Sequence, residues 1–272
     1  MKPAAFDYAR CESADEAVSL LAESGDDARI LAGGQTLLAA LNMRLAQPRV
    51  LADISRCADL GAVRVDGGML AVGASVTQAA LEHRPTLGGE VPLLPKVIPH
   101  IAHAQVRSRG TVCGSIAYAD PSAELPLALV ALGGQVVLRS RRGRRSVGAE
   151  DFFRGMLQTA READELIEEA RFPLQAAGTG YAFAEFAERH GDFAIVAVAV
   201  AAGREQVRFA VGGVADRPRV ACWPRMDGTD VEAAINDFAW ELDARDDAHA
   251  SAQYRRHLVR VLGRRALAEA AA

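Results

Sequence analysis

Two short loops, each placed between an extended segment and a helical pattern, constrain this sequence more than any other feature. The first, Ala32-Gly33-Gly34-Gln35-Thr36, follows the apolar run 28–32 and precedes the helical pattern 37–45. The second, Thr111-Val112-Cys113-Gly114-Ser115, has the same form ahead of a helix predicted over 121–132. Glycine permits close backbone approach, and successive amides at a helix start can bind phosphate. One glycine pair is equally consistent with a tight turn, whereas two such loops favour a dinucleotide site.

Length and charge exclude several classes of protein. The 272 residues are 50% hydrophobic, and at roughly 150 residues per domain they predict two domains with packed cores. The net charge of -4 does not favour nucleic acid or an anionic membrane as a partner. The longest apolar run, Phe193 to Ala202, is half a membrane span, and the first ten residues lack the pattern of a signal peptide. We therefore expect a soluble, cytoplasmic protein.

The cysteines and histidines do not predict a metal site. The cysteines are far apart and form no CxxC motif, so neither zinc nor an iron–sulfur cluster has suitable ligand spacing. His100 and His103 have a spacing of three, but no carboxylate or thiol accompanies them, and packing or surface roles are favoured. A reduced compartment fits this cysteine pattern best. The four cysteines are Cys11, Cys57, Cys113 and Cys222.

Local patterns predict a mixture of helices and strands. Ser13-Ala14-Asp15-Glu16 is a capping box, in which the Ser13 hydroxyl accepts from the Glu16 amide. Asp66-Gly67-Gly68 tolerates positive φ and predicts a hairpin. The predicted helices are 14–24, 37–45, 76–83, 92–104, 121–132, 230–243 and 251–268. The predicted strands are 28–32, 49–54, 62–65, 69–72, 135–139, 181–187, 193–201 and 207–214.

Two charged turns are ambiguous as functional sites. Arg141 to Arg145 holds four arginines in five residues, and a solvated hairpin tip explains it better than a phosphate site. Arg189-His190-Gly191-Asp192 lies between two apolar strands, and is either an ordinary connection or a segment near a ligand. The chain contains no evident nucleophile–base–orienter set and no HExxH motif, so hydrolysis has little support.

Three motifs in a fixed order resemble the FAD-binding medium subunit of molybdenum hydroxylases. They are Ala32 to Thr36, Gln105 to Pro126 and Arg189 to Ala194, and the resemblance covers essentially the whole chain. The family includes the flavoproteins of carbon monoxide dehydrogenase, nicotine and quinoline oxidoreductases and xanthine dehydrogenase. The resemblance implies a vanillyl-alcohol-oxidase-type (PCMH-type) FAD domain of two α+β subdomains over residues 1–175. A C-terminal domain, a three-stranded sheet with helices over residues 176–272, follows a flexible linker at 175–180.

The resemblance also implies which residues bind FAD. The two loops hold the pyrophosphate, and a helix within 101–106 lines the flavin. Glu124 contacts the cofactor, and Leu166 and Phe193 lie near the ring. No residue of this chain is implied to be catalytic or to bind a metal. The implied cofactor-binding set is Leu31, Ala32, Gly33, Gly34, Gln35, Thr36, Leu37, Ile101, Ala102, Val106, Thr111, Val112, Cys113, Gly114, Ser115, Ala119, Glu124, Leu166 and Phe193.

Three positions depart from the family pattern. Cys113 replaces the first glycine of the second pair, Tyr118 replaces a common histidine, and Phe193 replaces a tyrosine. A side chain at Cys113 would cost about 1 kcal/mol of strain if φ there were positive. Phe193 can stack on the ring but cannot donate a hydrogen bond to it.

The resemblance implies a division of labour among subunits. A large subunit carries the molybdenum cofactor, and a small subunit carries 2Fe–2S clusters whose electrons pass through FAD here to an external acceptor. A dimer of such heterotrimers and an N-heteroaromatic substrate are expected. Two alternatives remain. One is a stand-alone FAD oxidase, but 272 residues leave little room for the large substrate domain of such enzymes. The other is a flavin-free scaffold. The departures at Cys113 and Phe193 favour the scaffold, and the two glycine loops disfavour it.

Overall fold

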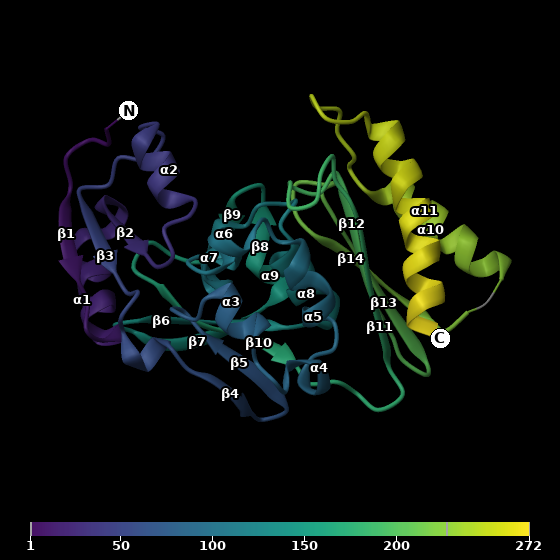
Figure 1. The fold of residues 1–272 in the computed structure, drawn as a ribbon, viewed down its shortest axis with the longest axis horizontal. Coiled ribbons are helices and arrows are strands. Elements are labelled where there is room, and N and C mark those ends of the chain that lie inside the picture. Colours follow the sequence, from purple (N-terminus) through teal and green to yellow (C-terminus); the bar gives the residue numbers. More distant parts are fainter. Residues whose placement is uncertain (1, 227, 272) are drawn as a thin grey trace.

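The computed structural model describes residues 2–226 and 228–271. Within them the strands form three main sheets of three, five and four strands and a separate two-stranded ribbon. Figure 1 shows the three main sheets following one another along the long axis, with the N-terminal elements at one end and the C-terminal helices at the other. The structure is a mixed fold of helices and strands, as predicted.

The N-terminal sheet is parallel and has the strand order β1-β3-β2. Helix α1 packs on it and begins at a cap in which the Ser13 hydroxyl accepts from the Glu16 amide at 3.3 Å, as the sequence predicts. The Glu16 carboxylate accepts from the Glu12 amide at 2.9 Å, one residue before the expected capping-box donor. The elements are β1 (Asp7–Arg10), α1 (Ala14–Ser24), η1 (Gly25–Asp27), β2 (Ala28–Leu31), α2 (Leu37–Asn42) and β3 (Val50–Asp53).

The central sheet is antiparallel, with the order β4-β5-β10-β6-β7, and a run of short helices lies beside it (Figure 1). The helix predicted over 92–104 is broken, because Pro95 and Pro99 lack amide donors and each starts a new short turn. The elements are η2 (Ala58–Leu60), β4 (Val63–Asp66), β5 (Met69–Gly73), α3 (Gln78–Glu82), α4 (Leu87–Glu90), α5 (Leu94–Val97), η3 (Ile98–His100), α6 (Ala104–Arg107), α7 (Val112–Tyr118), α8 (Glu124–Leu132), β6 (Gln135–Ser140), β7 (Gly143–Gly148), α9 (Ala149–Phe152), β8 (Phe153–Gly155), β9 (Gln158–Thr159) and β10 (Leu166–Pro173).

The C-terminal sheet has four antiparallel strands, so the predicted three-stranded sheet is wrong by one strand. The missed strand is β14, an edge strand whose side chains are mostly half-exposed and which ends at Pro224. Without a buried alternating face it gave no periodic signal. The elements are β11 (Gly180–Phe186), β12 (Val196–Ala202), β13 (Gln206–Gly212), β14 (Arg219–Pro224), α10 (Thr229–Glu241) and α11 (Ala252–Ala271).

Strand β12 is buried on both faces, which accounts for its unbroken apolar sequence. Ala197 and Ala199 belong to the large core shared with α8, whereas Val198 and Val200 belong to the core under α10 and α11. Small side chains therefore face α8, and larger branched ones face the C-terminal helices.

Candidate functional site

A cavity of about 540 Å³ is lined by residues from all three main parts of the chain. The N-terminal sheet contributes residues from β2 and the loop after it, and the central part contributes residues within 101–106 and 110–124. The implied helix along the flavin is only partly present, because Ile101 and Ala102 lie in a bend before α6 and Val106 lies within it. The turn at 191–193, which precedes β12, closes one end. A cleft of this size, with apolar walls and a few polar groups, is typical of a small-molecule site.

The first glycine loop touches the backbone ahead of the second. A Cβ atom on Gly33 would lie 2.1 Å from the Arg109 carbonyl oxygen, so only glycine allows this approach. Gly34 has a φ of +72°, which also favours glycine. The backbone amides of the segment 33–36 find no acceptor among the described residues. Residues 33–36 also line the cavity, so their four successive free donors are suited to form an anion-binding nest.

The second loop is fixed by its neighbours on both sides. The Gln78 amide donates to the Gly110 carbonyl at 2.8 Å, and the Val112 amide donates to Val76 at 3.1 Å. Thr111 caps α7 by accepting from the Gly114 amide at 3.0 Å. Because Thr111 and Val112 are occupied in this way, the Cys113 amide is left at the helix start with no acceptor in the described chain.

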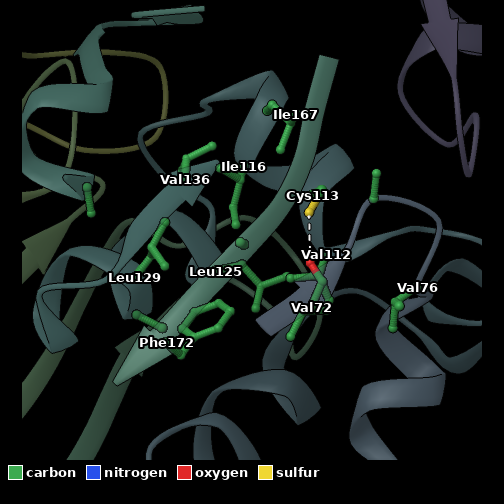
Figure 2. Packing of buried hydrophobic residues seen from close by; sticks show 14 of the residues in the cluster. Val72, Val76, Val112, Cys113, Ile116, Leu125, Leu129, Val136, Ile167 and Phe172 are labelled. Atoms are coloured by element: carbon green, nitrogen blue, oxygen red, sulfur yellow. Dashed lines mark hydrogen bonds between the residues drawn. The ribbon is translucent and has the colours of Figure 1, made fainter. Parts of the chain in front are cut away.

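Cys113 packs in the core and is not strained. It lies within α7, so the positive φ considered above does not arise. Its thiol donates to the Val72 carbonyl at 3.4 Å, and Figure 2 shows the side chain pointing away from its loop toward Val72. Burial raises the pKa of the Cys113 thiol to about 12, which makes it an unreactive packing group.

A buried acidic group stands at one wall of the cavity. Glu124, the first residue of α8, is 5% exposed, and burial raises its pKa to about 8. Glu185 adds to this shift in pKa, whereas His100 opposes it. The Nδ1 atom of His100 lies 3.8 Å from Oε1 of Glu185. Glu185 Oε2 has no hydrogen-bond partner in the described part of the chain. Glu124 is therefore a group that loses its proton near neutral pH inside the cavity.

The charged turn at 189–192 closes the cavity beside Ala102. Gly191 has a φ of +88°, and a Cβ atom there would lie 2.7 Å from the Ala102 carbonyl oxygen. The Arg189 guanidinium pairs with Asp192 at 3.0 Å. Phe193 follows the turn, lines the cavity and is 66% exposed. Of the two alternatives for this turn, its place in the cavity wall favours a position near a ligand.

Most of the implied cofactor-binding residues line this one cavity, from both loops and from positions as distant in sequence as Leu166 and Phe193. Three do not. Leu31 lies on β2, the Val112 side chain is fully buried in the core, and Ala119 ends α7 in the left-handed conformation.

The arginine cluster lies elsewhere and is paired with carboxylates, as expected for a surface hairpin. Arg141 and Arg142 bind Glu23 and Glu162, and Arg145 binds Glu165 at 2.6 Å.

The cavity also contains residues that the sequence did not point to. Gln78 is 5% exposed, and its Oε1 atom has no partner among the residues the structure describes. Arg29 and Arg161 contribute two guanidinium groups at the end formed by β2 and the turn before β10. The sequence could not indicate that Arg161 belongs to the site, because its neighbour Arg29 lies far away in sequence. Arg29 is the cation that most affects the pKa of Arg161.

The arrangement suits a molecule that has both an anionic group and apolar or flat parts. The loop 33–36, with its unpartnered amides, lines the cavity together with many apolar side chains. Among the described residues no group of three or more His, Cys, Asp or Glu side chains could hold a metal ion. Nor is any described helix long and apolar enough to cross a membrane.

Comparisons with known proteins agree with this geometry. The family described as the FAD binding domain in molybdopterin dehydrogenase matches residues 4–175. Caffeine dehydrogenase subunit beta from Pseudomonas sp. (strain CBB1) is 37% identical, with 100% of this chain and 96% of that protein covered. Nicotine 6-hydroxylase medium subunit from Paenarthrobacter nicotinovorans is 38% identical, with 100% and 99% covered. A structure of carbon monoxide dehydrogenase from Hydrogenophaga pseudoflava matches with a TM-score of 0.94 and 34% identity, covering 99% of this chain and 98% of that one.

Proposed function

Because this chain belongs to the family of FAD-binding domains of molybdopterin dehydrogenases, we propose that it is the FAD-binding medium subunit of a molybdenum hydroxylase. The observation that carries the proposal is the row of unpartnered amides at 33–36, set in the wall of a largely apolar cavity. When bound, FAD supplies the redox chemistry, and the chain supplies position and electrostatics.

Each part of the cavity has a role in this proposal. The loops 32–36 and 111–115 bind the pyrophosphate through backbone amides, and residues within 101–106 pack against the flavin ring. Phe193 covers the ring from the outer side without donating a hydrogen bond. Glu124 holds or releases a proton at its carboxylate beside the cofactor, since its pKa of about 8 is close to neutral pH.

The proposed division of the chain is a PCMH-type FAD domain over residues 1–175 and a C-terminal domain over residues 176–272. The family match ends at residue 175, and the next strand, β11, begins at Gly180. The N-terminal parallel sheet and the central antiparallel sheet are the two subdomains, and the cavity contains residues of both.

The partners are a large subunit with a molybdenum cofactor and a small subunit with 2Fe–2S clusters, assembled as a dimer of heterotrimers. Electrons then reach FAD from the small subunit and leave to an external acceptor. The names of the relatives support such complexes, since they are called subunits or medium subunits of dehydrogenases and hydroxylases. The unbridged cysteines suit a reducing cytoplasm.

The substrate class we propose for the complex is an N-heteroaromatic compound. Caffeine and nicotine, named in two relatives, both contain such rings. The carbon monoxide dehydrogenase match shows that the same medium-subunit fold also serves a different substrate. A panel of heteroaromatics and carbon monoxide, assayed with the purified complex, tests this point, and turnover of carbon monoxide alone would contradict it.

The flavin role is tested by gel filtration of the chain after incubation with FAD, followed by visible spectroscopy and identification of the flavin released by acid. The wild-type chain is expected to retain non-covalent FAD. Gly33→Ala should lower the affinity at least tenfold, because its Cβ forces the two loops apart. Gly88→Ala is the matched control, since no atom lies within 4 Å of the added Cβ.

Other outcomes favour the alternatives. A chain that binds no FAD, alone or co-expressed with its large and small subunits, supports the scaffold. Reduction of the flavin by an organic substrate added to the isolated chain supports a stand-alone oxidase.

A further inference from the structure

Two arginines at one end of the cavity lack a carboxylate partner. Neither Arg29 nor Arg161 forms a salt bridge within the described residues, although most arginines nearby do. Glu165 and Asp164 are close to Arg161 but are engaged by Arg145 and Arg142. This end of the cavity therefore has two guanidinium groups with no direct ion pair among the described residues, although Glu165, Asp26 and Asp164 still favour the charged form of Arg161.

Backbone contacts hold the Arg161 guanidinium in place. Its Nη1 atom donates to the carbonyls of Glu162 at 2.8 Å and Glu165 at 2.9 Å, and to Ala163 at 3.3 Å. No partner of Nε or Nη2 is present in the described chain, so these donors remain available. Arg29 is anchored in the same manner, through Nη1 to the carbonyls of Asp26 and Ala28 at 2.8 Å.

Holding these cations together is unfavourable for the protein alone. Burial and the neighbouring Arg29 lower the pKa of Arg161. Arg161 is partly buried and Arg29 is exposed, so an anion or aromatic ring bound between them would relieve the repulsion that Arg161 meets. The surrounding wall is apolar and includes Leu21, Ala28 and Ile54.

The position of the pair identifies which half of the cofactor it meets. The amides at 33–36 mark the pyrophosphate, and exposed Phe193 marks the end from which electrons can leave. Arg29 lies on β2, close enough to Arg161 to affect its pKa, and Figure 1 shows β2 on one side of α6 and α7 and β12, the strand after Phe193, on the other. A flat base and its phosphate suit this end, because a guanidinium both stacks on aromatic rings and donates to phosphate.

We propose that Arg161, supported by Arg29, binds the adenylate half of FAD and makes the site select FAD over FMN. This inference rests on the proposed flavin function, and it concerns a residue outside both glycine loops. Arg161 is a specificity-determining residue here and takes no part in the redox chemistry.

The test compares FAD and FMN binding to the full chain, by titration of flavin fluorescence, in Arg161→Gln and the wild type. FAD affinity should fall at least tenfold in Arg161→Gln, whereas FMN affinity should stay within twofold, because FMN lacks the adenylate. ADP should compete with FAD for the wild type and at least tenfold less well for the variant. Arg154→Gln is the matched control, because Arg154 is exposed on β8 and outside the cavity.

Each other result has a definite meaning. Equal FAD affinity in Arg161→Gln and the wild type overturns the inference. An equal loss of FAD and FMN binding also overturns it. That result would mean that Arg161 only stabilises the conformation of its own turn and does not contact the adenylate. A wild-type chain that binds neither flavin, even with its partner subunits, contradicts the flavin function itself.

Discussion

Replacing Glu124 by Gln should stabilise the flavin-free chain at alkaline pH and leave it nearly unchanged at acid pH. In the folded chain the pKa of Glu124 is raised from 4.5 to about 8, mainly by burial. The unfolded chain ionises this group near 4.5, so the folded state binds more protons between these pH values. Wild-type stability contributed by this group is therefore present below pH 4.5 and is lost as the pH rises to 8.

The shift sets the size of the effect. A pKa difference of this size corresponds to about 5 kcal/mol at 1.36 kcal/mol per unit, which is a ceiling because water in the cavity can hydrate the carboxylate. Glutamine has no charge at either pH and keeps the shape of the side chain. The free energy of unfolding of Glu124→Gln, relative to wild type, should therefore increase by roughly 2–4 kcal/mol between pH 5 and pH 8.

Urea unfolding followed by circular dichroism at pH 5, 6.5 and 8 measures this difference. Groups that do not interact with Glu124 titrate equally in both proteins and cancel. Glu241→Gln serves as control, because Glu241 is exposed on α10, and it should show no such trend. A difference that stays flat, or that shrinks as the pH rises, would show that Glu124 is ionised in the folded chain at pH 5 and would refute the reasoning.

Two further predictions concern the cavity mouth and the thiols. Gly191→Ala should destabilise the turn by roughly 1–3 kcal/mol and weaken FAD binding. The reason is that φ at this residue is +88° and the new Cβ atom would lie 2.7 Å from the Ala102 carbonyl oxygen. Calorimetry measures the loss of stability, and flavin titration measures the loss of binding. A thiol-specific chromogenic reagent at pH 8 should modify Cys222 quickly in the folded chain and the other cysteines only on unfolding, because those three are buried and have raised pKa values. Rapid reaction of two or more thiols in the native protein would contradict that accessibility.

The sequence was sufficient for features that depend on local chemistry. The cap at Ser13, the two glycine loops and most of the helices and strands arise from residues within a few positions of each other. The family resemblance added the prediction that distant segments meet at one site. The fixed order of the three motifs indicates which segments lie close together, whereas periodicity reports only local structure.

Features that depend on long-range packing were missed. Strand β14 exists because β13 offers it a free edge, and its own residues alternate only weakly. The proximity of Arg161 to Arg29, and of Glu124 to Glu185 and His100, results from sheets and helices meeting across the cavity. Side-chain charge at these positions was visible in the sequence, but what each charge faces was not.

The two-faced strand β12 makes the C-terminal sheet a common wall for two cores. Its alanine face contacts the core that contains α8, and its valine face supports the C-terminal helices. Since α8 starts at Glu124 in the cavity wall, larger side chains on the alanine face of β12 would displace α8 and so shift the Glu124 carboxylate. The geometry of the cavity is thus set partly by the size of side chains on a strand of the C-terminal sheet, which couples the two halves of the chain mechanically.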